Sequence, residues 1–226
     1  MNQSRRLSLL IGRPLPVVYA LNMILQCGCS DRAPMPQTLT ASDSVRMINS
    51  ILQHRASVDS FFRYDSRSPF QQDTGTHFEG IKWFPPDLGF YVRSRLHRYE
   101  PSVPVVVLGT KGEERRQLKV GFFEVPYAGR VHQLNAYKED ESSDSRYLKN
   151  LSVWFTDATT NKETYGVGRY LDVGEENPDS EYIYTLDFNA AYNPYCAYSS
   201  LYSCAIPRRE DHFDIPIRAG ETKYHQ

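Results

Sequence analysis

From residue 63 onward, short runs rich in β-branched and aromatic residues alternate with turn signals, and this alternation restricts the fold more than any other feature. The runs expected to be strands are 78–84, 90–97, 103–110, 115–125, 131–137, 151–156, 165–173 and 182–187. Lys111-Gly112 separates two of them and predicts a hairpin. Short strands at this spacing favour a mainly β domain, either an antiparallel β-sandwich or a partly closed barrel.

One helix is expected before the strands. Thr40 is a favourable N-cap, with Asp43 three residues later, and apolar residues then recur at helical spacing at Val45, Ile48, Ile51 and Leu52. We predict a helix over residues 41–61 that packs across one side of the β domain. An amphipathic helix that binds a partner is the alternative.

Composition limits the class of protein. The chain has 226 residues, 40% of them hydrophobic, and a mean hydropathy of -0.54, as in one soluble domain with a leader. The formal net charge of -1 offers no basic face for nucleic acid. The chain lacks a Gly-rich nucleotide loop, a G-x-S-x-G elbow and an H-E-x-x-H motif, so the sequence identifies no cofactor.

The first thirty residues have the layout of a secretory signal. Arg5 and Arg6 precede an apolar run that ends at Gly28-Cys29. This ending is similar to a bacterial lipobox, so we predict a signal peptide over 1–29, lipidation of Cys29, a tether over 30–40 and a single β-rich domain over 41–226. Cys27 is the alternative acceptor, and a plain cleaved signal peptide is the alternative leader. The predicted location is the bacterial cell envelope, membrane-anchored and extracytoplasmic.

Polar and aromatic residues gather between 164 and 221. Asp187 and Asn189 lie two apart, so they share a face if the strand persists. Arg169 is expected to pair with Asp187 or Glu221, or to hold an anionic ligand. The candidate ligand-binding residues are Arg169, Asp187, Asn189, Asn193, Tyr198, Glu210 and Glu221. Alternatively, these groups tie a long loop to the sheet.

Cys196 and Cys204 form a C-x7-C pair with no His between them. Such spacing does not favour a metal site. In an exported protein a disulfide is the simplest expectation, and two free thiols are the alternative. A thiol nucleophile would need a base, for which His212 is the nearest candidate.

The run DFNAAYNPYCAY at 187–198 resembles the signature of the uncharacterised family called domain of unknown function 1684. GRYL at 168–171, AGE at 219–221, Ser68-Pro69-Phe70 and Gly80 also fit it, so the resemblance covers residues 58–223. It implies a shared fold and no known activity. Ala205 stands where the family usually has Pro, and Asp211 stands where it usually has Asn.

Three functions remain open at this stage. The chain is expected to be an exported lipoprotein whose β-rich domain binds a small ligand in a polar-aromatic pocket. It can instead be a hydrolase-like enzyme that uses carboxylates of the 187–221 region, or a structural envelope module without a ligand. A binder or enzyme should bury charged groups with shifted pKa values around a cavity.

Overall fold

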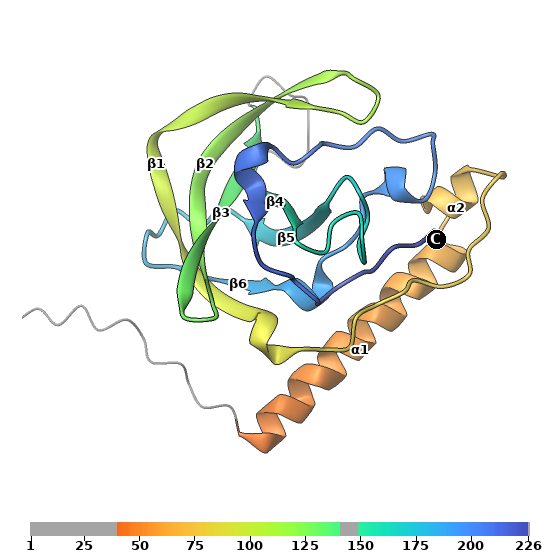
Figure 1. Ribbon diagram of the computed structural model, residues 1–226, viewed down its shortest axis with the longest axis horizontal. Coiled ribbons are helices and arrows are strands. Elements are labelled where there is room, and N and C mark those ends of the chain that lie inside the picture. The colour runs from red at the N-terminus through yellow and green to blue at the C-terminus, as the bar shows by residue number, and fades with distance from the viewer. Residues whose placement is uncertain (1–39, 141–148, 226) are drawn as a thin grey trace, which may run out of the picture. The chain divides into compact units, whose positions relative to one another are not determined.

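The computed structural model describes residues 40–140 and 149–225 (Figure 1). The predicted signal peptide, the Cys27 and Cys29 lipidation candidates and nearly all of the tether lie outside the described residues. Within the described part, no helix is both long and apolar enough to cross a membrane.

Helix α1 spans Ala41–Tyr64, which confirms the predicted helix and extends it beyond Phe61. Its start is a capping box, because the Thr40 hydroxyl accepts a hydrogen bond from the Asp43 N–H and the Asp43 carboxylate accepts one from the Thr40 N–H. A short second helix, α2, covers Pro69–Gln72.

Among the described residues, six antiparallel strands form the main path of the sheet. They are β1 (Tyr91–Leu108), β2 (Glu114–Tyr127), β3 (Arg130–Glu139), β4 (Asn150–Asp157), β5 (Arg169–Glu175) and β6 (Ile183–Asp187). Their spatial order is β5-β4-β3-β2-β1-β6, and the two-residue β7 (His212–Phe213) joins β4 in parallel. The end strands β5 and β6 come close to each other, so the sheet is nearly closed into a barrel. In the described part of the chain, 3-10 turns lie at Leu88–Phe90, Phe188–Ala190, Tyr195–Ala197 and Arg209–Asp211.

The predicted hairpin is present. β1 and β2 pair from Val103 opposite Lys119 to Leu108 opposite Glu114. Gly112 lies in the connecting turn with a φ of +88°, a conformation that residues with side chains rarely adopt.

Three predicted strands differ from the structure. Runs 90–97 and 103–110 belong to the single strand β1, whose pairing with β2 is irregular between Arg98 and Val103. Run 78–84 is not a strand, and only Trp83 makes an isolated bridge, to Glu221. Its apolar side chains pack on α1 instead, because Phe78 and Ile81 join the cluster around Phe62.

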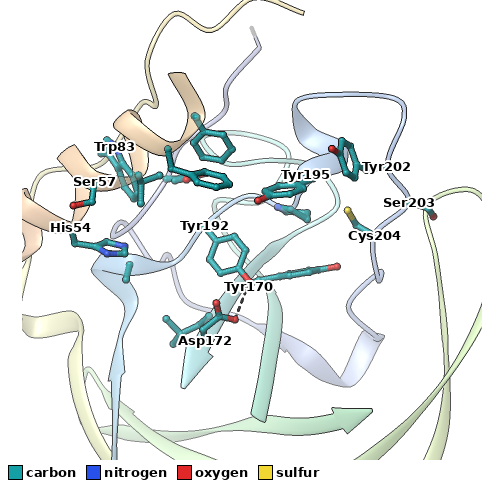
Figure 2. A pocket seen from close by; sticks show the side chains of 17 residues that line it. His54, Ser57, Trp83, Tyr170, Asp172, Tyr192, Tyr195, Tyr202, Ser203 and Cys204 are labelled. Atoms are coloured by element: carbon teal, nitrogen blue, oxygen red, sulfur yellow. Dashed lines mark hydrogen bonds between the residues drawn. The ribbon is translucent and has the colours of Figure 1, made fainter. Parts of the chain in front are cut away.

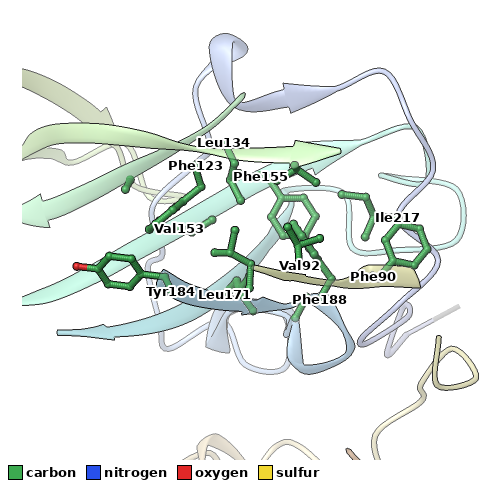
Figure 3. Packing of buried hydrophobic residues seen from close by; sticks show 14 of the residues in the cluster. Phe90, Val92, Phe123, Leu134, Val153, Phe155, Leu171, Tyr184, Phe188 and Ile217 are labelled. Carbon is green, nitrogen blue, oxygen red and sulfur yellow. The ribbon is translucent and has the colours of Figure 1, made fainter. Parts of the chain in front are cut away.

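The main core fills the barrel interior. Phe123, Leu134, Phe155, Leu171 and Phe188 are almost completely buried there (Figure 3). A separate aromatic cluster fixes α1 to the rest of the domain. In it, the Phe62 ring lies 5.7 Å from Phe70, 5.9 Å from Phe78 and 5.1 Å from Tyr198 between centroids.

Candidate ligand-binding site

A cavity of about 720 Å³ lies between the C-terminal half of α1, strand β5 and the segment 190–204 (Figure 2). α1 contributes residues between 54 and 62, β5 contributes 170–172, and Trp83 comes from the loop before β1. This volume is within the range of small-molecule sites in proteins.

The cavity walls are mainly aromatic. Trp83, Tyr170, Tyr192, Tyr195 and Tyr202 all line it, and Figure 2 shows them distributed around the space. Tyr170 and Tyr192 meet edge to face at 5.9 Å between ring centroids, and Tyr195 and Tyr202 do so at 5.1 Å. These contacts hold the rings of the 190–204 segment in place.

Glu221 borders the cavity and is fully buried. Its Oε2 accepts hydrogen bonds from the Asn193 N–H at 2.8 Å and from the Tyr198 hydroxyl, whereas Oε1 has no partner among the described residues. Burial raises the pKa of Glu221 to about 7, although these two hydrogen bonds and the charge of Arg169 act in the opposite direction. The carboxyl can therefore exchange a proton near neutral pH.

Close backbone approach positions Glu221. Its N–H donates to the Ala191 carbonyl at 2.8 Å, and Gly220 precedes it with a φ of +78°. A Cβ at Gly220 would lie 2.4 Å from the same carbonyl oxygen, so the AGE motif needs glycine there.

Arg169 fixes the backbone of the C-terminal segment that carries Glu221. Its fully buried guanidinium forms an ion pair with Asp157 at 2.7 Å and donates to the carbonyls of Ile217, at 2.7 Å, and Ala219. The expected pairing of Arg169 with Asp187 is wrong, because Asp157 at the end of β4 takes that place. Arg169 does not line the cavity.

Asp187 and Asn189 connect the turn after β6 to the loop before β1. Asp187 Oδ1 accepts from the N–H and the Nδ2 of Asn189, at 3.0 and 2.9 Å. The Asn189 amide group then makes two 2.8 Å hydrogen bonds with the backbone of Asp87. Asp187 and Asn189 border a smaller cavity of about 230 Å³, apart from the aromatic walls described above.

Glu210 is not part of the site. It is exposed and pairs with Lys119 at 2.8 Å and with Arg208 at 3.1 Å. Glu210, a candidate ligand-binding residue from the sequence, does not line the cavity. The structure thus brings Asn193, Tyr198 and Glu221 together and leaves the other candidates in structural contacts.

Asp172 is a site residue that the sequence analysis missed. It lies on β5 at the exposed edge of the cavity, and the Tyr192 hydroxyl donates to its Oδ1 at 3.0 Å (Figure 2). Crowding by neighbouring atoms raises the pKa of Asp172, but solvent reaches this side chain and screens the effect. Asp172 lies two residues after Tyr170 in the predicted strand 165–173, so both side chains are on one face of that strand. This spacing in the sequence could have identified Asp172 as a candidate.

The two cysteines adjoin the cavity, and Cys204 lines it. Both are free thiols in the structure, and the Cys196 N–H donates to Cys204 Sγ at 3.2 Å. A hydrogen bond from Cys204 lowers the pKa of the Cys196 thiol to about 6, and the same contact raises the pKa of Cys204. Their oxidation to a disulfide stays a prediction.

His212 is not a base for these thiols, because its Nδ1 hydrogen-bonds to the Thr156 hydroxyl at 2.9 Å and its Nε2 lies 3.6 Å from Asp214. Across the described ranges 40–140 and 149–225, no group of three or more His, Cys, Asp or Glu is arranged to hold a metal ion.

Fold and site together define a barrel-like β domain with an aromatic cavity covered by an N-terminal helix. The chain belongs to the family described as protein of unknown function (DUF1684), whose model matches residues 76–222. The match includes Asp172 and Glu221, whereas α1 precedes it.

A solved structure resembles the chain over most of its length. This is the solution NMR structure of an uncharacterised protein from Haloarcula marismortui, with 29% identity and a TM-score of 0.58, covering 81% of this chain and 97% of that one. The comparison with curated proteins finds no match.

Proposed function

We propose that this protein binds a small organic molecule in the cavity between α1 and β5. The observation that carries the proposal is an aromatic cavity lined by Glu221, a buried carboxyl group whose Oε1 has no partner among the described residues. A buried polar atom left unpaired costs about 1–3 kcal/mol. A donor on a bound ligand would offset that cost.

Blocking the cavity tests this function. Ser57 lies on α1 at the cavity, and its hydroxyl donates to the carbonyl of Gln53 one turn earlier, so Ser57→Trp should fill the space with little loss of stability. Ser60→Trp places the same side chain at an equally exposed position of the same helix that does not line the cavity, and it is the matched control.

We expect a metabolite library to contain compounds that raise the melting temperature of the wild-type protein and the Ser60→Trp variant. The Ser57→Trp variant should not respond to them. Equal responses in all three proteins, or no response in any, would argue against the proposal.

We also propose that the domain lies outside the cytoplasm and is held at the membrane by a lipid anchor. Arg5, Arg6 and the apolar run up to Gly28-Cys29 support export and lipidation. Mass spectrometry of protein from its own cells should find a lipidated Cys29 as the mature N-terminus. Cys29→Ala should then release the protein from membranes, with Cys27→Ala as the control. An intact Met1 or an unlipidated soluble form would contradict this part.

An enzyme is the second candidate, and the pKa of Glu221 favours it. A carboxyl with a pKa of about 7 beside a cavity is suited to general acid-base catalysis at neutral pH. If the domain turns its ligand over, Glu221→Gln should abolish turnover. A ligand recovered unchanged from the wild-type protein after long incubation would argue for binding alone.

A further inference from the structure

We infer that the ligand is an organic ammonium compound, with at least one N–H and an apolar body. This inference rests on the proposed ligand-binding function and adds the chemical class of the ligand. Three features of the cavity carry it, namely its aromatic walls, its charge and its unpaired acceptor.

Aromatic walls favour a cation because the faces of the rings carry negative potential. The domain already uses this attraction beside the cavity. The Arg55 guanidinium lies 4.8 Å from the Trp83 ring centroid, and that of Arg67 lies 5.8 Å from the Phe61 ring. Tyr170 and Tyr192 add two further rings on the side of β5.

The charge of the lining also favours a cation. Among the described residues that line the cavity, Asp172 and Glu221 are acidic, none is Lys or Arg, and His54 is the basic one. Arg169, the cation behind Glu221, already pairs with Asp157, and Arg55 donates to the Phe84 carbonyl at 2.8 Å. An anionic ligand would therefore face two acidic groups and find only His54 as a basic group in the lining, so its loss of water would be costly.

The unpaired acceptor selects an ammonium group that can donate. Glu221 Oε2 is already occupied by the Asn193 N–H and the Tyr198 hydroxyl, which leaves Oε1. Oε1 is buried, so a small shift of the Glu221 side chain would present it to a ligand donor. A quaternary ammonium group has no N–H for this oxygen. Asp172 at the mouth would interact with the incoming charge, and the aromatic walls would hold the apolar body.

Matched probes separate charge from shape. The first set of titrations at neutral pH uses 2-phenylethylamine, 2-phenylethanol and phenylacetate. The second set carries the same three head groups on a cyclohexylmethyl skeleton. The readout is the amide chemical shifts of the full domain. We expect the ammonium member of each set to bind at least about tenfold tighter than the alcohol, because a charged donor to a buried carboxylate is among the stronger hydrogen bonds. The carboxylate member should bind most weakly.

Two variants assign the preference to the cavity. Glu221→Gln keeps the shape of the side chain and should reduce the preference for ammonium over alcohol by about tenfold. Glu114→Gln, which removes an exposed carboxylate on β2, should leave the preference unchanged.

The outcomes distinguish the two proposals. If alcohols or carboxylates bind at the cavity as tightly as the ammonium compounds, the inference about charge fails while the proposed binding function stands. If no member of the three classes shifts cavity resonances at millimolar concentration, and the metabolite library also gives no cavity-dependent stabilisation, both fail. An ammonium preference that survives Glu221→Gln unchanged would also overturn the inference.

Discussion

Replacing Glu221 by glutamine should make the domain more stable at alkaline pH and leave it nearly unchanged in acid. The wild-type carboxyl is fully buried, and burial is the main reason for its raised pKa. The amide keeps an oxygen to accept from Asn193 and Tyr198 but cannot ionise. The substitution therefore removes the cost of holding a charge in the interior.

The magnitude follows from the pKa of Glu221 in the unfolded and folded states, 4.5 and about 7. The folded protein binds this proton more tightly than the unfolded chain. The unfolding free energy therefore falls with rising pH over the range in which the folded protein keeps a proton that the unfolded chain has lost. The contribution is full below pH 4.5 and is lost as the pH rises from 4.5 to about 7. At about 1.4 kcal/mol for each pKa unit, the full loss is about 3 kcal/mol.

Urea unfolding of both proteins between pH 4 and pH 9, at intervals of about 0.5, measures this difference. The curves of unfolding free energy against pH should coincide near pH 4 and separate by about 3 kcal/mol in favour of the variant above neutral pH. Glu114→Gln is the control and should follow the wild type within about 0.5 kcal/mol at every pH. A variant that is less stable than the wild type at alkaline pH, or a separation that does not depend on pH, would refute the reasoning.

Three further predictions concern the framework around the site. Arg169→Ala leaves the buried Asp157 carboxylate without its cation and should lower the unfolding free energy by about 3–5 kcal/mol. The control Arg218→Ala removes an exposed ion pair and should leave the unfolding midpoint nearly unchanged. Equal effects of the two substitutions would contradict the structural role of Arg169. Gly112→Val should destabilise the domain by about 1 kcal/mol or more because of the positive φ, and Gly112→Asn should recover part of this loss; a neutral valine variant would exclude backbone strain. In protein from its own cells, alkylation and mass spectrometry should find Cys196 and Cys204 joined as a disulfide, and ready labelling of both thiols would show that they remain reduced.

Local patterns predicted most of the fold. The capping box at Thr40 marked the start of α1, and the Lys111-Gly112 turn marked the hairpin, because both signals act within a few residues. The failures have long-range causes. Runs 90–97 and 103–110 were predicted as separate strands with Pro101 between them, but pairing with β2 on both sides of that point keeps β1 continuous. Run 78–84 has a strand-like composition, yet its aromatic residues are used against α1.

The site was predictable only where its residues are close in sequence or share a motif. Asn193, Tyr198 and Glu221 were proposed together, and they do meet. Arg169 pairs with Asp157 and not with Asp187, because β5 is hydrogen-bonded to β4, whose last residue is Asp157. The α1 wall and Asp172 were missed, since the sequence does not show which face of the helix meets which strand.

Amide chemical-shift mapping with a tightly binding ammonium probe tests the central claim, that the cavity is a ligand site, most directly. We expect the shifts to gather in the α1 residues 54–62, in 170–172 of β5 and in 190–204, and to disappear in Ser57→Trp but not in Ser60→Trp. Shifts confined to the exposed first turns of α1 or to the β1–β2 hairpin, or shifts that survive Ser57→Trp, would contradict the claim.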